Sequence, residues 1–227
     1  MRLKDFKEFL DNKGIEYKEK RSLLSQKLLV NYKGLKFLFL EFSLRNYFQG
    51  VKISFFFPKP LKLGLYCGYN MEYLSSLSYK YQKDFLTKKI KLPFPEVECW
   101  AKKEKIVKEF FSDYSLIESL RNLKDSLKIS QQRGGVFTFD SSAFIIKDEF
   151  IEVFIDEKAF FEPERILESF YQLVSKFLEI LRSRSSEIYQ EPASDKIFKG
   201  IVIFLIILTF LVLGLVFYVN FKFGLKM

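Results

Sequence analysis

The pattern of apolar and polar positions separates one long apolar segment from the rest of the chain. From Gly200 to Val219 no residue carries a charge, and most positions are Leu, Ile, Phe or Val. An α-helix of that length is about 30 Å long, which matches the hydrocarbon thickness of a bilayer. We therefore expect a transmembrane helix that includes Gly200, Leu205, Thr209, Gly214 and Val219. It holds no GxxxG motif, and Thr209 and Gly214 are the candidates for a looser contact with another helix.

Amphipathic helices are predicted at three places before this segment. Residues 3–12 place apolar side chains on one face, and Gly14 is in position to end that helix. Residues 102–123 repeat apolar positions at helical spacing with a break at Ser112 to Ser115, which favours two short helices. Pro163 stands at a first helical position before a single apolar stripe. That stripe contains Ile166, Phe170, Leu173, Phe177 and Leu181.

Alternating apolar positions predict strands in the remaining sequence. Residues 28–32 and 35–42 form a hairpin about Lys33-Gly34, and a third strand ends before Pro58. Further strands are expected at 61–68, 96–101, 136–140, 143–147 and 150–156, whereas 70–91 is ambiguous between helix and loop. This mixture predicts the α+β class: one or more antiparallel sheets with flanking amphipathic helices, plus one C-terminal transmembrane helix.

The same pattern gives an expected domain organisation. A soluble α+β domain covers residues 1–181, either as one unit or as two halves, 1–95 and 96–181. A polar linker that contains Pro192 covers 182–199, the transmembrane helix covers 200–219, and a short tail covers 220–227.

Charges beside the apolar segment predict its orientation. Arg182, Arg184, Lys196 and Lys199 precede it, whereas Lys222 and Lys226 follow it. The excess of basic residues on the N-terminal side favours a cytoplasmic N-terminal domain. Residues 1–14 alternate charged and apolar positions and resemble no signal peptide. We therefore expect a tail-anchored, single-pass membrane protein.

The net charge of +9 is concentrated near the N-terminus, because residues 1–95 hold 19 basic and 8 acidic residues. Five lysines in this part stand close to Tyr79, Tyr81 and Phe85: Lys80, Lys83, Lys88, Lys89 and Lys91. Such a basic and aromatic cluster suits anionic lipid headgroups, nucleic acid, or plain solvent exposure. Nucleic acid is the less favoured of the two partners, because no RNA-binding or helix-turn-helix motif accompanies the lysines.

Chemistry-bearing motifs are scarce. The chain has no histidine, which excludes histidine-dependent triads and histidine-ligated metals. Phosphate-binding loops, nucleophile elbows, zinc-protease motifs and EF-hand loops do not occur either. Cys67 and Cys99 form no CxxC pair. We expect both to be buried free thiols, and a disulfide between them is the alternative. Trp100, the only tryptophan, is expected to be buried or half-buried beside Cys99.

Acidic residues are frequent between Asp148 and Glu168, and solvent-facing positions on a meander and a helix start account for them without catalysis. The sequence thus offers no catalytic residue, no metal ligand set and no cofactor site. It favours a non-enzymatic binding or scaffolding module at a membrane, with the bilayer and a protein partner or a second copy as partners. The alternatives are an accessory subunit of a larger membrane complex and an enzyme on a membrane-proximal substrate.

Overall fold

A computed structural model of the chain divides into two compact units, residues 1–190 and residues 191–227. It describes residues 2–22, 25–44, 48–70, 86–128, 142–156, 162–184, 188–189 and 193–223. The expected strand at 136–140 and most of the ambiguous segment 70–91 lie outside these ranges.

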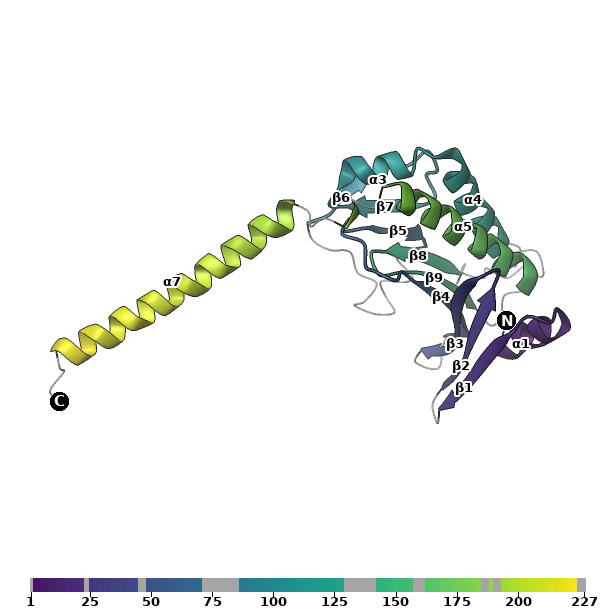
Figure 1. Ribbon diagram of the computed structural model, residues 1–227, viewed down its shortest axis with the longest axis horizontal. Coiled ribbons are helices and arrows are strands. Elements are labelled where there is room, and N and C mark those ends of the chain that lie inside the picture. The colour runs from purple at the N-terminus through teal and green to yellow at the C-terminus, as the bar shows by residue number, and fades with distance from the viewer. Residues whose placement is uncertain are drawn as a thin grey trace. The chain divides into compact units, whose positions relative to one another are not determined.

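The first unit is built on a nine-stranded sheet in which every pair of neighbours is antiparallel (Figure 1). Its spatial order is β1-β2-β3-β4-β9-β8-β5-β7-β6, so β1 and β6 are the edges. The strands are β1 (Tyr17–Ser22), β2 (Ser25–Tyr32), β3 (Leu35–Leu44), β4 (Phe48–Phe56), β5 (Tyr66–Tyr69), β6 (Lys88–Ile90), β7 (Glu98–Ala101), β8 (Ala143–Lys147) and β9 (Phe150–Asp156). Strands β8 and β9 lie between β4 and β5, so distant parts of the chain share one sheet.

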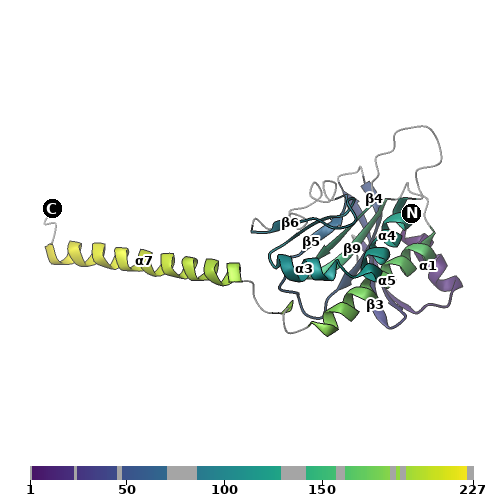
Figure 2. The same ribbon diagram turned by 90° about the horizontal axis from the view of Figure 1, so that it is seen from above.

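The described helices of this unit cover one face of the sheet (Figure 2). They are α1 (Leu3–Asn12), α3 (Glu104–Phe110), α4 (Tyr114–Lys128) and α5 (Pro163–Ser183). Aromatic contacts join the layers: Phe6 of α1 lies 5.1 Å from Phe39 of β3, and Phe37 lies 5.4 Å from Phe170 of α5, both between ring centroids. The α+β class predicted from the sequence is therefore confirmed, with the core between the helices and one sheet face.

Several predicted elements agree closely with the structure. Helix α1 has the predicted bounds, and Gly14 follows it with φ +63° while the amide of Ile15 donates to the Leu10 carbonyl at 2.9 Å. This is a glycine-terminated helix end, in which the positive φ suits a residue without Cβ. The β2–β3 hairpin turns at Lys33 and Gly34, whose φ angles of 49° and 82° match a two-residue turn.

Three local differences from the prediction have physical reasons. Strand β1 is not predicted, because four of its six residues are charged and only pairing with β2 reveals it. The expected strand at 61–68 begins at Tyr66, since Gly64 has φ +62° and interrupts the extended backbone. The helix break falls before Tyr114, where Asp113 Oδ1 accepts from the amides of Ser115 at 2.8 Å and Leu116 at 3.2 Å.

The second unit contains helix α7 (Ala193–Phe223). It begins seven residues before Gly200, so the polar segment expected as a linker is partly helical. Helix α5 ends at Ser183, and Ile188 is fully buried, with its carbonyl accepting from the Lys62 amide at 3.0 Å. The buried Ile188 therefore attaches the described part of this segment to the first unit.

Candidate membrane anchor and basic sheet face

Helix α7 contains a segment, Gly200–Tyr218, that is long and apolar enough to cross a membrane. Its mean hydropathy is 3.1 and none of it is buried within the protein. Leu205 is 53% exposed and Phe217 75%. Large apolar side chains that the protein itself leaves uncovered need another apolar environment, and lipid or neighbouring helices supply one.

The polar and small positions of this segment make no outside contact in the described structure. Thr209 donates its hydroxyl to the carbonyl of Leu205 at 2.8 Å, so the group is satisfied within the helix. A Cβ built on Gly200 or Gly214 would have no neighbour within 4 Å. The predicted span positions therefore lie on one exposed helix; Val219 belongs to α7, but its side chain is outside the described set.

The face of the sheet opposite the helices carries a group of lysines that we name the basic patch: Lys18 and Lys20 of β1, Lys27 of β2 and Lys36 of β3. They are exposed, and none forms a salt bridge with a described residue. The register places Lys20 opposite Lys27 and Lys18 opposite Leu29. Side chains alternate between the two faces along a strand, so the residues next to these lysines in sequence, such as Leu28 and Phe37, point into the core.

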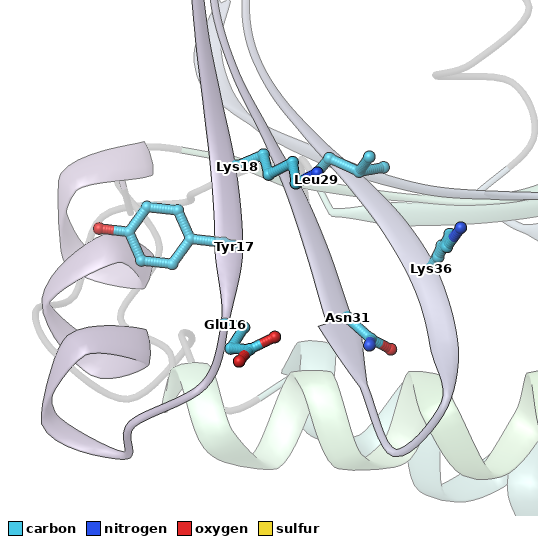
Figure 3. Close-up of a pocket in the computed structure, with 6 residues that line it drawn as sticks. All are labelled: Glu16, Tyr17, Lys18, Leu29, Asn31 and Lys36. Carbon is cyan, nitrogen blue, oxygen red and sulfur yellow. The ribbon is translucent and has the colours of Figure 1, made fainter.

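A hollow of about 450 Å³ lies within the basic patch (Figure 3). It is lined by Glu16, Tyr17, Lys18, Leu29, Asn31 and Lys36. The Tyr17 ring turns toward α1, where its hydroxyl donates to Asp11 Oδ1 at 2.8 Å. The hollow therefore offers two ammonium groups and an amide beside an apolar side chain, with one carboxylate among them.

The predicted lysine cluster is only partly described. Lys80 and Lys83 lie outside the described residues, whereas Lys88, Lys89 and Lys91 are exposed on or beside edge strand β6. Lys89 pairs with Glu98 at 2.9 Å and lies 5.3 Å from the centre of the Trp100 ring. Sequence reasoning missed the basic patch. A signal was present: Lys18 and Lys20 stand two positions apart in β1, and Lys27 alternates with the core positions Leu28 and Val30 of β2.

Farther along the same sheet face, opposite the described helices, a buried ion pair lies among apolar side chains. Glu152 of β9 is fully buried, accepts from the Ser54 hydroxyl at 3.1 Å, and lies 3.3 Å from the Lys52 ammonium. Phe154 and Ile145 are buried on the same face. The expectation that acidic residues between 148 and 168 face solvent is thus wrong for Glu152. Alternation along β9 points its side chain to the same face as Phe154, and both side chains are buried there.

Asp148, in the β8–β9 turn, is the second acidic residue that is not a plain solvent-facing group. Its carboxylate accepts from the amides of Gly64 at 2.8 Å and Leu65 at 3.1 Å, and its carbonyl accepts from the Leu61 amide at 2.7 Å. Burial raises the pKa of Asp148 to about 6, and the two amide donors oppose that rise. These contacts tie the turn to the segment before β5, which is a structural task.

This raised pKa predicts a pH dependence of stability. The folded chain holds the Asp148 proton more tightly than the unfolded chain, in which the pKa of this carboxyl is near 3.8. The protonated carboxyl therefore stabilises the fold fully below that pH, and this stabilisation is lost as the pH rises through about 6. The difference in unfolding free energy between the wild type and Asp148→Asn should fall by about 2 kcal/mol from pH 4 to pH 7. Urea unfolding in detergent at each pH measures it, with Glu118→Gln on α4 as the control for losing an exposed carboxylate. A difference that stays constant over this range would refute the assignment.

The cysteines are buried neighbours on the helix-covered face. Cys67 of β5 lies directly opposite Cys99 of β7, and both thiols are free, as the favoured interpretation expects. Burial, followed by the hydrogen bond with Cys99, raises the pKa of the Cys67 thiol well above its usual value, which disfavours a reactive thiolate.

Trp100 is half-buried, as predicted, and its ring lies 5.5 Å from Tyr66. Among the described residues no group of three or more Cys, Asp or Glu could hold a metal.

No protein-family model and no curated protein matches the sequence. Among solved structures, the chain is similar to the crystal structure of the mycobacterial trehalose monomycolate transport factor A, TtfA, at 9% sequence identity and a TM-score of 0.48. The match covers 79% of this chain and 93% of that chain. A likeness of this degree transfers no function.

Proposed function

We propose that this chain is a membrane-anchored binding module without catalytic activity, held at a bilayer by α7. The observation that carries the proposal is the uncovered apolar surface of Gly200–Tyr218. Its leucine, isoleucine, valine and phenylalanine side chains each favour insertion by about 0.3–0.6 kcal/mol, so their sum is on the order of 5–10 kcal/mol. No Asp, Glu, Lys or Arg within the segment opposes that sum.

We further propose that the nine-stranded domain lies on the cytoplasmic side. Four basic residues, Arg182, Arg184, Lys196 and Lys199, precede the apolar segment, and two, Lys222 and Lys226, follow it. Basic residues close to a span favour the cytoplasmic side.

The buried polar groups of the domain support a binding role over a catalytic one. Glu152 is engaged by Lys52 and Ser54, and Asp148 by the amides of Gly64 and Leu65. In both cases the carboxylate joins strands or a turn and does not converge with a second acid in a described hollow. The hollow that is described lies instead on an exposed sheet face, which suits the binding of a partner surface.

Protease protection of the full chain tests the orientation. With an N-terminal epitope tag, protease added to intact cells or spheroplasts should leave the domain uncut, and protease added after the membrane is opened should digest it. Digestion in intact cells would place the domain on the outside. A tag at the C-terminal end serves as the internal control, because its accessibility should be the reverse.

Cross-linking in native membranes, followed by purification in mild detergent, tests the binding role. One cross-linked partner, or a homo-oligomer, that survives high dilution supports a module acting on its own. Co-purification with several other membrane subunits in fixed ratio would instead favour an accessory subunit. Purified chain that turns over a lipid substrate would overturn the non-enzymatic assignment.

A further inference from the structure

We infer that the basic patch, on the sheet face opposite the described helices, is a binding surface for anionic phospholipid headgroups. The inference rests on the proposed membrane anchoring and names one ligand that the domain meets there. The patch is defined by Lys18, Lys20, Lys27 and Lys36 and surrounds the hollow beside Leu29.

Charge complementarity is the first argument. The four ammonium groups are exposed and form no salt bridge with a described residue, in contrast to Lys52 and Lys89 elsewhere on this face, which pair with Glu152 and Glu98. Glu16 is the carboxylate that lines the hollow together with Lys18 and Lys36. A surface with this excess of free positive charge attracts an anionic membrane, and the attraction grows with each lysine close to it.

The apolar residues between the lysines are the second argument. Leu29 is 39% exposed, and Leu38 and Leu40 on β3 are half-buried on the same face. The register places Lys18, Leu29 and Leu38 side by side across three strands, and Lys20, Lys27 and Leu40 in the adjacent row. At a bilayer surface the phosphate groups lie above the acyl chains. The ammonium groups of the patch can contact the phosphates while the exposed leucine faces the acyl-chain boundary.

The hollow gives the headgroup a defined place. Lys18 and Lys36 supply charged donors, the Asn31 side chain can donate from its amide, and Leu29 forms an apolar wall (Figure 3). Ammonium and amide donors are the groups that hold a phosphate oxygen, whereas a neutral choline headgroup offers less attraction to them. The patch should therefore distinguish anionic from zwitterionic lipid.

The chain between the domain and the apolar segment is short enough to keep the domain close to the bilayer that the anchor would enter. Tyr189 is the last described residue of the first unit, and the apolar segment starts at Gly200. Residues 193–199 are helical and add about 10 Å, and the residues before them reach about 14 Å when fully extended. A tether of this length makes contact with the anchoring membrane an intramolecular event, for which weak attraction suffices.

The test uses the full chain in lipid nanodiscs of phosphatidylcholine, with or without about one third phosphatidylserine. Leu40→Cys, opposite Lys27 on the same sheet face and outside the hollow, carries a polarity-sensitive fluorophore. The parent chain, whose Cys67 and Cys99 are buried, measures background labelling. The probe should shift to the blue and be quenched by nitroxide-labelled headgroups in anionic discs only. Salt at about 0.5 M should reverse both signals, because it screens exposed charges within a few ångströms.

Matched variants separate this surface from the total charge of the domain. The triple variant Lys18→Gln, Lys27→Gln, Lys36→Gln should lower the ratio of quenched to unquenched chain about 100-fold, which is about fivefold for each lysine lost. The control Lys4→Gln, Lys105→Gln, Arg165→Gln removes the same charge from exposed helix positions and should change the ratio less than twofold. Replacement of the same three patch lysines by Arg should preserve binding, and Glu16→Gln should raise the ratio about fivefold.

Each remaining result has a defined meaning. A probe that ignores lipid charge in a correctly inserted chain overturns the headgroup site and leaves the membrane anchor standing. A chain that does not enter nanodiscs at all removes the anchor and this inference together. Equal losses from the patch and control variants, or protection of the probe by single-stranded RNA but not by anionic lipid, would also overturn it.

Discussion

Arginine at the centre of α7 should release the protein from the membrane fraction. We expect the double variant Leu208→Arg, Leu211→Arg to lose about 6–8 kcal/mol of insertion free energy, because each change replaces a favourable leucine with a charge that costs about 2.5–3.5 kcal/mol at the helix centre. That loss is comparable with the whole favourable sum for Gly200–Tyr218. Alkaline carbonate extraction measures the outcome: the wild type should remain in the pellet and the double variant should move to the supernatant.

A conservative pair controls for effects of mutation in this helix. Leu208→Ile, Leu211→Ile keeps the apolar surface and should pellet like the wild type. Unfolding of the domain can be followed separately through Trp100, the single tryptophan, so that aggregation is not mistaken for insertion. Continued carbonate resistance of the arginine variant would show that another segment holds the chain at the membrane.

Loss of the buried carboxylate at Glu152 is the second large expected effect. Glu152→Ala should destabilise the domain by about 3–5 kcal/mol, because it leaves the Lys52 ammonium, 16% exposed, without its 3.3 Å partner and removes the acceptor of Ser54. For a unit of this size such a loss lowers the Tm by roughly 10 °C or more. Thermal unfolding of the full chain in detergent, followed by Trp100 fluorescence, provides the measurement.

Two further variants distinguish a paired charge from simple packing. Glu152→Gln keeps the volume and the acceptor for Ser54, so its cost should be about 1–3 kcal/mol. The double variant Lys52→Met, Glu152→Met replaces both charges with apolar groups of similar length and should be about 2 kcal/mol more stable than Glu152→Ala. If the double variant is the least stable of the three, the ion pair itself stabilises the domain and the unpaired ammonium is not the main cost.

Elements with a strong local pattern are predictable from this sequence. Helix α1 and the start of α5 carry an apolar stripe together with a glycine stop or an N-terminal proline, and the β2–β3 hairpin carries its own turn residues, Lys33 and Gly34. Strand β1 lacks any such signal: its sequence is largely charged, and it is a strand because β2 supplies the hydrogen bonds. Local periodicity cannot predict this strand, because its pairing with β2 is a contact between different parts of the chain.

The basic patch shows the same limit at the level of the candidate site. The charge excess of residues 1–95 is visible in the sequence, but the four lysines of the basic patch are not among the five that stand together between residues 80 and 91. Lys18 and Lys36 are 18 positions apart in the chain and line one hollow, because β1, β2 and β3 are adjacent in the sheet. The sequence shows only which lysines are close along the chain, whereas the patch is formed by lysines that are close across neighbouring strands.

The sequence by itself determined the α+β class, the main amphipathic helices and the apolar segment Gly200–Tyr218, since each depends on periodicity or on an uninterrupted apolar run. Only the tertiary structure decided which face of the sheet the helices cover, which lysines remain unpaired, and that Glu152 is buried while Asp148 holds a turn. The physical reason is that burial and charge pairing depend on strand order, and the position of β8 and β9 between β4 and β5 is set by packing of the whole domain.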